Sequence, residues 1–124
     1  MTSDRKIIKR RIIRDRNTYK LLPKVCQECK RREPDSIIYF PGVEGPGNFY
    51  YRYNIHEGIK EGSSIFTKEN GRVYYWSKTG SWDMNYKVCV TCSKCKDKVV
   101  TMNKIELMLR TGRELREYGP SEGE

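Results

Sequence analysis

Two short stretches, Cys26-Gln27-Glu28-Cys29 and Cys89-Val90-Thr91-Cys92-Ser93-Lys94-Cys95, hold all five cysteines of this 124-residue chain. Two residues between cysteines allow a tight turn to direct both sulfur atoms at one point. Two such pairs can surround a zinc ion tetrahedrally, with Zn–S distances of about 2.3 Å. The odd number of cysteines and the heavily charged start of the chain argue against disulfide bonds. A thioredoxin-like redox site would need one such pair beside a βαβ pattern, which the sequence lacks. The spacing therefore predicts a zinc site.

The second group of cysteines offers two pairs with the same spacing, because Cys92 can pair with either Cys89 or Cys95. The residues Tyr86-Lys87-Val88 are typical of the end of a strand, and a helical pattern follows the group. A zinc-binding pair at this junction would begin at Cys89. We therefore predict four ligands: Cys26, Cys29, Cys89 and Cys92. In this register Cys95 is a free thiol, and in the alternative register it is a ligand.

Length and composition indicate one modest globular domain. With 36% hydrophobic residues and ten glycines, the chain lies just below the ordinary globular range. Zinc would support such a core, since a structural zinc ion contributes about 10–16 kcal/mol of apparent binding free energy to the folded form. The sequence shows neither a membrane-spanning apolar run nor a secretion signal. We therefore expect an intracellular protein, in the cytoplasm or nucleus, of the host cell if it is viral.

Positive charge is concentrated at the start of the chain. The net charge is +9, and residues 1–24 contain nine basic and only two acidic side chains. Such a concentration predicts an anionic partner, with a solvated basic face or a localisation signal as the alternative. We predict six side chains that contact nucleic acid: Lys9, Arg10, Arg11, Arg14, Arg16 and Lys20.

The remaining pattern predicts an α+β fold: a small zinc-stabilised antiparallel sheet with a basic N-terminal segment and a C-terminal helix. Runs over 36–40 and 49–55 read as strands, and Asn70-Gly71 between β-prone runs predicts a hairpin with a type I′ turn. Helical spacing predicts one core-facing stripe, formed by Val99, Met102, Ile105, Met108 or Leu109, and Leu115. The predicted organisation is a basic segment over 1–24, a single zinc domain over 25–118 with a β-rich aromatic insert at 36–88, and a tail over 119–124.

Aromatic residues are concentrated in the predicted insert. Twelve of the fourteen lie between Tyr39 and Tyr86, too many for one inner face, because neighbouring strand residues point in opposite directions. A second aromatic face could stack nucleic-acid bases or dock a protein. Alternatively, helices cover both faces of the sheet. The candidates for stacking are Tyr51, Tyr53 and Tyr75.

The order of a cysteine pair, hairpin material, a second cysteine pair and a helix resembles treble-clef zinc modules, and among them the HNH-type nucleases. The residues that carry the resemblance are Val25-Cys26-Gln27-Glu28-Cys29, Ser36-Ile37-Ile38-Tyr39-Phe40 and Val88-Cys89-Val90-Thr91-Cys92. In such nucleases the strand after the first pair ends in histidines, one of which activates water. Here the corresponding residues are Tyr39-Phe40-Pro41-Gly42. The resemblance therefore implies the scaffold without the activity.

No catalytic set stands out elsewhere in the sequence. His56 is the only histidine, and no nucleophile has an obvious base partner. The sequence therefore favours a non-enzymatic zinc-binding module that binds DNA, RNA or a transcription-type complex. The alternative is a protein-interaction module, such as a small viral or host regulator, that docks on an acidic protein surface. A nuclease of the HNH type is the third candidate.

Overall fold

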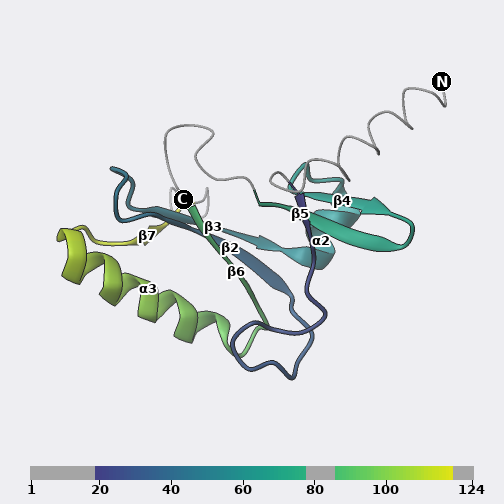
Figure 1. Cartoon of the computed structure of the whole chain (residues 1–124), viewed down its shortest axis with the longest axis horizontal. Coiled ribbons are helices and arrows are strands. Elements are labelled where there is room, and N and C mark those ends of the chain that lie inside the picture. Colours follow the sequence, from purple (N-terminus) through teal and green to yellow (C-terminus); the bar gives the residue numbers. More distant parts are fainter. Residues whose placement is uncertain (1–18, 78–85, 119–124) are drawn as a thin grey trace. The chain divides into compact units, whose positions relative to one another are not determined.

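Residues 19–77 and 86–118 are described by the computed structural model of the chain (Figure 1). They belong to two compact units, one of residues 19–22 and 57–77 and the other of residues 23–56 and 86–118. The predicted α+β class is confirmed, but the strands form two sheets and not one. No helix of the described part has both the length and the hydropathy needed to cross a membrane.

The first unit is built on a three-stranded antiparallel sheet with the strand order β1-β5-β4. Its strands are β1 (Tyr19–Leu21), β4 (Phe66–Glu69) and β5 (Arg72–Trp76). The predicted hairpin is confirmed, since Asn70 and Gly71 join β4 to β5 with φ angles of 55° and 74°. These positive φ angles are those that a type I′ turn requires. The end of the predicted basic segment is part of this sheet, because β1 pairs with β5.

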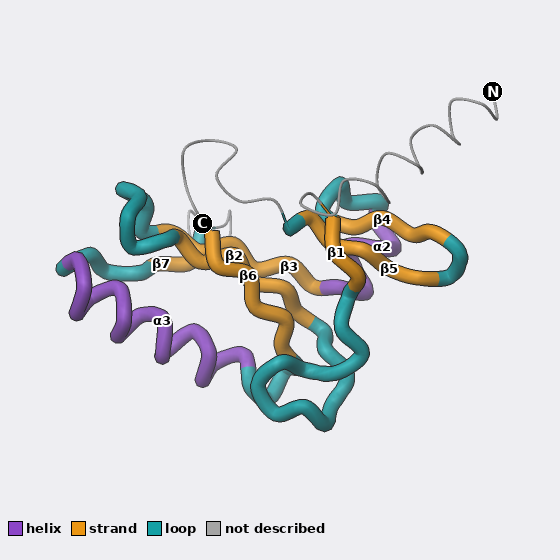
Figure 2. Tube along the Cα trace, viewed as in Figure 1, coloured by secondary structure: helices purple, strands orange, loops and turns teal. Residues whose placement is uncertain are grey.

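The second unit is built on a four-stranded sheet with the strand order β6-β2-β3-β7 (Figure 2). Its strands are β2 (Ser36–Pro41), β3 (Phe49–Asn54), β6 (Tyr86–Thr91) and β7 (Arg116–Glu117). Strand β2 pairs antiparallel with both β3 and β6, whereas β7 is parallel to β3. Every residue of β2 is buried, as expected for an apolar central strand.

Helix α3 (Lys96–Thr111) covers one face of the second sheet (Figure 1). The core between them is a cluster of six buried side chains: Ile38, Phe40, Tyr50, Val99, Leu107 and Leu115. The helix ends at Gly112, whose φ of 77° is left-handed and whose N–H donates to the Met108 carbonyl. Glycine favours this C-terminal conformation because it has no Cβ.

The predicted core stripe of this helix is only partly right. Val99 and Leu115 are buried, but four members or alternatives of the stripe are exposed: Met102, Ile105, Met108 and Leu109. Leu107, which was not predicted, faces the core in their place. Apolar residues recur at helical spacing on two sides of α3, so periodicity alone does not identify the side that packs on the sheet.

Helix α2 (Ile55–Glu61) was not predicted, and the boundary between the two units falls within it. Ile55, expected as the end of a strand, is instead the first residue of this helix. Within the first unit, Gly58 allows the Phe66 ring to approach the helix closely, because a Cβ at position 58 would overlap Cε2 of that ring. The sequence gives only seven residues of helix here, too few for a periodic signal.

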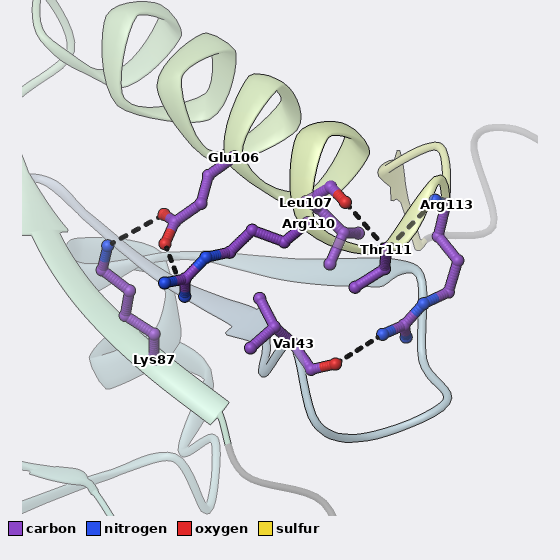
Figure 3. Close-up of polar contacts among 7 residues, drawn as sticks. All are labelled: Val43, Lys87, Glu106, Leu107, Arg110, Thr111 and Arg113. Carbon is purple, nitrogen blue, oxygen red and sulfur yellow. Dashed lines mark hydrogen bonds and ion pairs between the residues drawn. The ribbon is translucent and has the colours of Figure 1, made fainter.

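The loop between β2 and β3 is held by the segment that follows α3 (Figure 3). The guanidinium of Arg113 donates hydrogen bonds to the carbonyl oxygens of Val43 at 2.8 Å and Gly47 at 2.5 Å. Nearby, the Glu106 carboxylate lies 3.9 Å from Lys87 Nζ and 3.7 Å from Arg110 Nη1. The two Arg113 hydrogen bonds therefore fix the glycine-rich loop to the segment after α3, whereas the Lys87–Glu106 ion pair links α3 to β6.

The packing of α3 can be tested with two leucines of the same helix. Leu107 is 4% exposed and Leu109 is 80% exposed. Leu107→Ala should lower the free energy of unfolding by about 2–5 kcal/mol, because it leaves a cavity in the core. Leu109→Ala should change it by less than about 0.5 kcal/mol. Denaturant unfolding measures both, and a larger loss for Leu109→Ala would show that α3 packs through its other side.

Candidate metal centre

Four cysteine sulfur atoms meet at one end of the second sheet. The Sγ atoms of Cys26, Cys29, Cys92 and Cys95 all lie within 4.8 Å of one another. Those of Cys29 and Cys92 are 4.0 Å apart, and neither residue forms a disulfide. A tetrahedron with Zn–S bonds of about 2.3 Å has S···S edges of about 3.8 Å. The arrangement is therefore compatible with a zinc module, and zinc and iron are the metals that favour four thiolates.

The first pair lies in a tight loop after β1. The Cys26 N–H donates to the Arg32 carbonyl at 2.7 Å, and the Lys30 N–H donates to the Cys26 carbonyl at 2.9 Å. The Glu28 N–H points at Cys26 Sγ, 3.3 Å away. Lys30 has a φ of 61°, which allows the chain to reverse within the loop. The backbone thus turns both sulfur atoms of the pair to one side.

The second pair forms the junction between β6 and α3. Cys92 follows the last residue of β6, and Cys95 directly precedes the first residue of α3. The N–H groups of Cys95 and Lys96 both donate to the Cys92 carbonyl, at 3.2 and 3.1 Å. Thiolates are favoured near a helix N-terminus, where unpaired N–H groups and the helix dipole provide partial positive charge.

The two pairs are tied together by hydrogen bonds between the first loop and β6. The Gln27 N–H donates to the Val90 carbonyl, and the Val90 N–H donates to Gln27 Oε1, both at 2.9 Å. Gln27 therefore binds β6 through both its backbone N–H and its side-chain amide oxygen. This contact brings Cys26 and Cys29 beside the chain that leads to Cys92.

The four gathered cysteines differ from the predicted set, in which Cys89 stood in the place of Cys95. Strand β6 does not end at Val88 but continues to Thr91, so Cys89 lies within the strand. It is paired with Ile38 and packs against the core cluster beneath α3. Its sulfur is not part of the group of four. The alternative register, with Cys95, is the one that matches the observed grouping.

Backbone N–H groups favour ionisation of the first cysteine pair. Those of Arg32 and Arg31 lower the pKa of Cys29 to about 6. Burial opposes ionisation of Cys26, but the N–H groups of Cys29, Cys92 and Glu28 outweigh it and lower its pKa. Burial and hydrogen bonds with the neighbouring cysteine side chains raise the pKa of Cys95 to about 12. A bound cation would displace the remaining protons, since thiolates are the ligands.

Other predicted site residues lie apart from this group. Lys20 is exposed in β1, and Tyr75 is only 7% exposed in β5 of the same unit. Tyr51 and Tyr53 are partly buried on one face of the second sheet. The remaining predicted nucleic-acid contacts lie outside the described residues: Lys9, Arg10, Arg11, Arg14 and Arg16.

No protein-family model matches the chain, and comparisons with curated proteins and with solved structures give no significant match. Among the described residues, the four-cysteine group is the candidate site with the most specific chemistry. Its position joins a loop, a strand and a helix of the second unit.

Two cysteine variants distinguish the observed group from the predicted one. Cys95→Ala should abolish tight metal binding, because only three thiolates of the group remain. Cys89→Ala should retain one equivalent of metal, because its sulfur packs in the core. Elemental analysis of each purified variant, after dialysis against a weak chelator, measures the difference. Metal retained by Cys95→Ala but lost by Cys89→Ala would restore the predicted set, and metal-free wild-type protein would exclude the centre.

Proposed function

We propose that the protein is a zinc-stabilised, non-enzymatic module that binds nucleic acid. The observation that carries the proposal is the concentration of positive charge, with a net charge of +9 of which residues 1–24 supply +7. Neutralising phosphates with such side chains releases counterions, which provides most of the affinity in sequence-independent binding. DNA and RNA are both compatible with this chemistry.

The loop of the first cysteine pair supports the proposal. Arg31 and Arg32 stabilise the Cys29 thiolate through their backbone N–H groups, and their side chains are exposed. Lys30 beside them is exposed as well. The loop therefore combines two roles, since its cysteines would bind the metal while three consecutive basic side chains face solvent.

The scaffold is best described as similar to a treble clef. The first cysteine pair precedes the β2–β3 hairpin, and the second pair lies at the start of a helix. Four cysteines would close the coordination sphere of zinc and leave no open position for substrate or water. The end of β2, where HNH-type nucleases carry histidines, consists of buried Phe40 and Pro41. Both features favour binding over cleavage.

A protein-interaction module is the second candidate, and the outer side of α3 favours it. A hollow of about 280 Å³ is lined by six residues: Lys104, Ile105, Met108, Leu109, Glu114 and Leu115. Exposed apolar groups of this kind often mark contacts between proteins. An acidic protein surface would suit the positive net charge of the chain.

The role of the basic segment is tested by replacing Arg10, Arg11, Arg14 and Arg16 with alanine. If each contacts a phosphate of a duplex, the slope of log K against log salt should become less steep by about 3.6, since each contact contributes about −0.9. Fluorescence anisotropy at several salt concentrations measures the slope. The control replaces four exposed basic residues elsewhere in the chain: Lys60, Lys68, Arg72 and Lys104. If the slope of log K against log salt falls equally in both variants, the effect is due to net charge alone. Wild-type protein that binds no nucleic acid would exclude the proposed function.

The cysteine loop is tested by the double variant Arg31→Ala and Arg32→Ala. Its metal content should remain at the wild-type level, because these residues support Cys29 through backbone N–H groups that alanine retains. Its affinity for nucleic acid should fall, with a slope less steep by about 1.8. Metal analysis and the same salt titration measure the two effects. An unchanged salt slope with full metal content would show that the loop does not contact nucleic acid.

A further inference from the structure

The second sheet has an aromatic face on the side opposite to α3. In β2, Ile38 and Phe40 belong to the core under α3, so Tyr39 between them points to the other side. Tyr39 pairs directly with Tyr51 of β3. Pro41, on the same side as Tyr39, pairs with Tyr86 of β6. Residues paired in register lie on the same face, so tyrosines from three strands gather there.

Ring contacts show that these side chains form an extended surface. The ring of Tyr51 lies 4.8 Å from that of Tyr118 and 6.1 Å from that of Tyr86, between centroids. Tyr118 also contacts Phe49 at 5.9 Å. Phe49 is 40% exposed and Tyr118 is 57% exposed. We call this run of four rings the aromatic face, and define it by Phe49, Tyr51, Tyr86 and Tyr118.

Within the four strands of the second sheet, the positions on the same side as the aromatic face carry no carboxylate. The nearest acidic residue in the sheet, Glu117, points to the other side, where it accepts a hydrogen bond from the Tyr50 hydroxyl and pairs with Arg52. Arg116 is in register with Phe49, and its guanidinium lies 3.7 Å from the exposed Glu114 carboxylate. The described part of the second unit has thirteen basic and eight acidic side chains, which suits a polyanion.

Tyrosine rings suit unpaired bases better than they suit an apolar protein surface. Each base offers a flat π-surface, and stacking on an aromatic side chain contributes about 1–3 kcal/mol per base. The tyrosine hydroxyls can form hydrogen bonds with base edges or phosphates. In a duplex the same π-surfaces are hidden within the stack of base pairs, so only a single strand can use them.

We propose that the aromatic face stacks unpaired bases of a single-stranded nucleic acid. This inference rests on the proposed function, because phosphate contacts of the basic residues would hold the strand while the rings hold its bases. It predicts that the protein prefers single strands to duplexes.

The test uses the full-length, zinc-loaded protein with fluorescent oligo-dT, oligo-U and a duplex of equal length. Tyr118→Leu and Tyr51→Leu should each weaken single-strand binding by about 5- to 150-fold, the factor that corresponds to one stacked base. Duplex affinity and the salt slope should remain unchanged, because no phosphate contact is removed. Tyr74→Leu, which changes a partly buried tyrosine of the first unit, is the matched control and should have no effect. Losses for both single strands, or for only one of them, support the proposal.

Photocrosslinking keeps the test independent of any loss of folding in the variants. Wild-type protein irradiated with an oligonucleotide containing 5-iodouridine should yield crosslinked peptides that contain Tyr51, Tyr86 or Tyr118. Crosslinks confined to other peptides would overturn the inference, and so would full single-strand affinity in a folded Tyr118→Leu variant. The proposed function would stand in either case if the protein still binds duplexes. A change in oligomeric mass of Tyr118→Leu without a change in affinity would assign the face to a second copy of the chain. Wild-type protein that binds no nucleic acid would overturn both proposals.

Discussion

The second unit depends on the close approach of four cysteine sulfur atoms from two distant parts of the chain. Cys29 and Cys92 are 63 positions apart in sequence, yet their sulfur atoms are 4.0 Å apart. The hydrogen bonds between Gln27 and Val90 hold the first loop against β6 and so fix the approach. Burial and hydrogen bonds with the neighbouring cysteine side chains raise the pKa of Cys95, and four ionised thiolates at this distance would also repel one another. A divalent cation would offset this repulsion by binding all four thiolates, and it would link the loop, the strand and the helix at a single point.

Local signals in the sequence predicted local structure well. The Asn-Gly turn was predictable because two adjacent residues must both adopt positive φ, and few other residue pairs do so easily. The cysteine spacing indicated a metal site because two residues between cysteines allow a tight turn that directs both sulfur atoms at one point. The structure brings Cys95 into the group in place of the predicted Cys89, because the strand that was expected to end at Val88 continues to Thr91. The β-branched residues Val90 and Thr91 extend the strand, and alternation then directs Cys89 toward the core.

Features that depend on contacts between distant parts of the chain could not be predicted from local sequence signals. Two sides of α3 carry apolar residues at helical spacing, and only the sheet beneath selects Val99 and Leu107 for burial. The strands were assigned to one sheet, whereas pairing divides them between two, because strand propensity carries no information about the partner. Sequence alternation did indicate that the aromatic residues would occupy two faces. It did not separate Tyr75, which is buried, from Tyr51, which lies on the aromatic face.

The central position of β2 has a consequence for how the chain folds during synthesis. Strand β2 is fully buried between β3 and β6, but β6 begins 45 positions after β2 ends. During translation this apolar strand would emerge with one edge unpaired, and an exposed edge is a site of aggregation. Closing the loop between the two cysteine pairs has a length-dependent entropic cost of roughly 4 kcal/mol, whereas the β4–β5 hairpin closes over two residues. We therefore expect the hairpin to form early and the second sheet to be completed only after Cys92 and Cys95 have left the ribosome, when a metal ion could first capture the closed state.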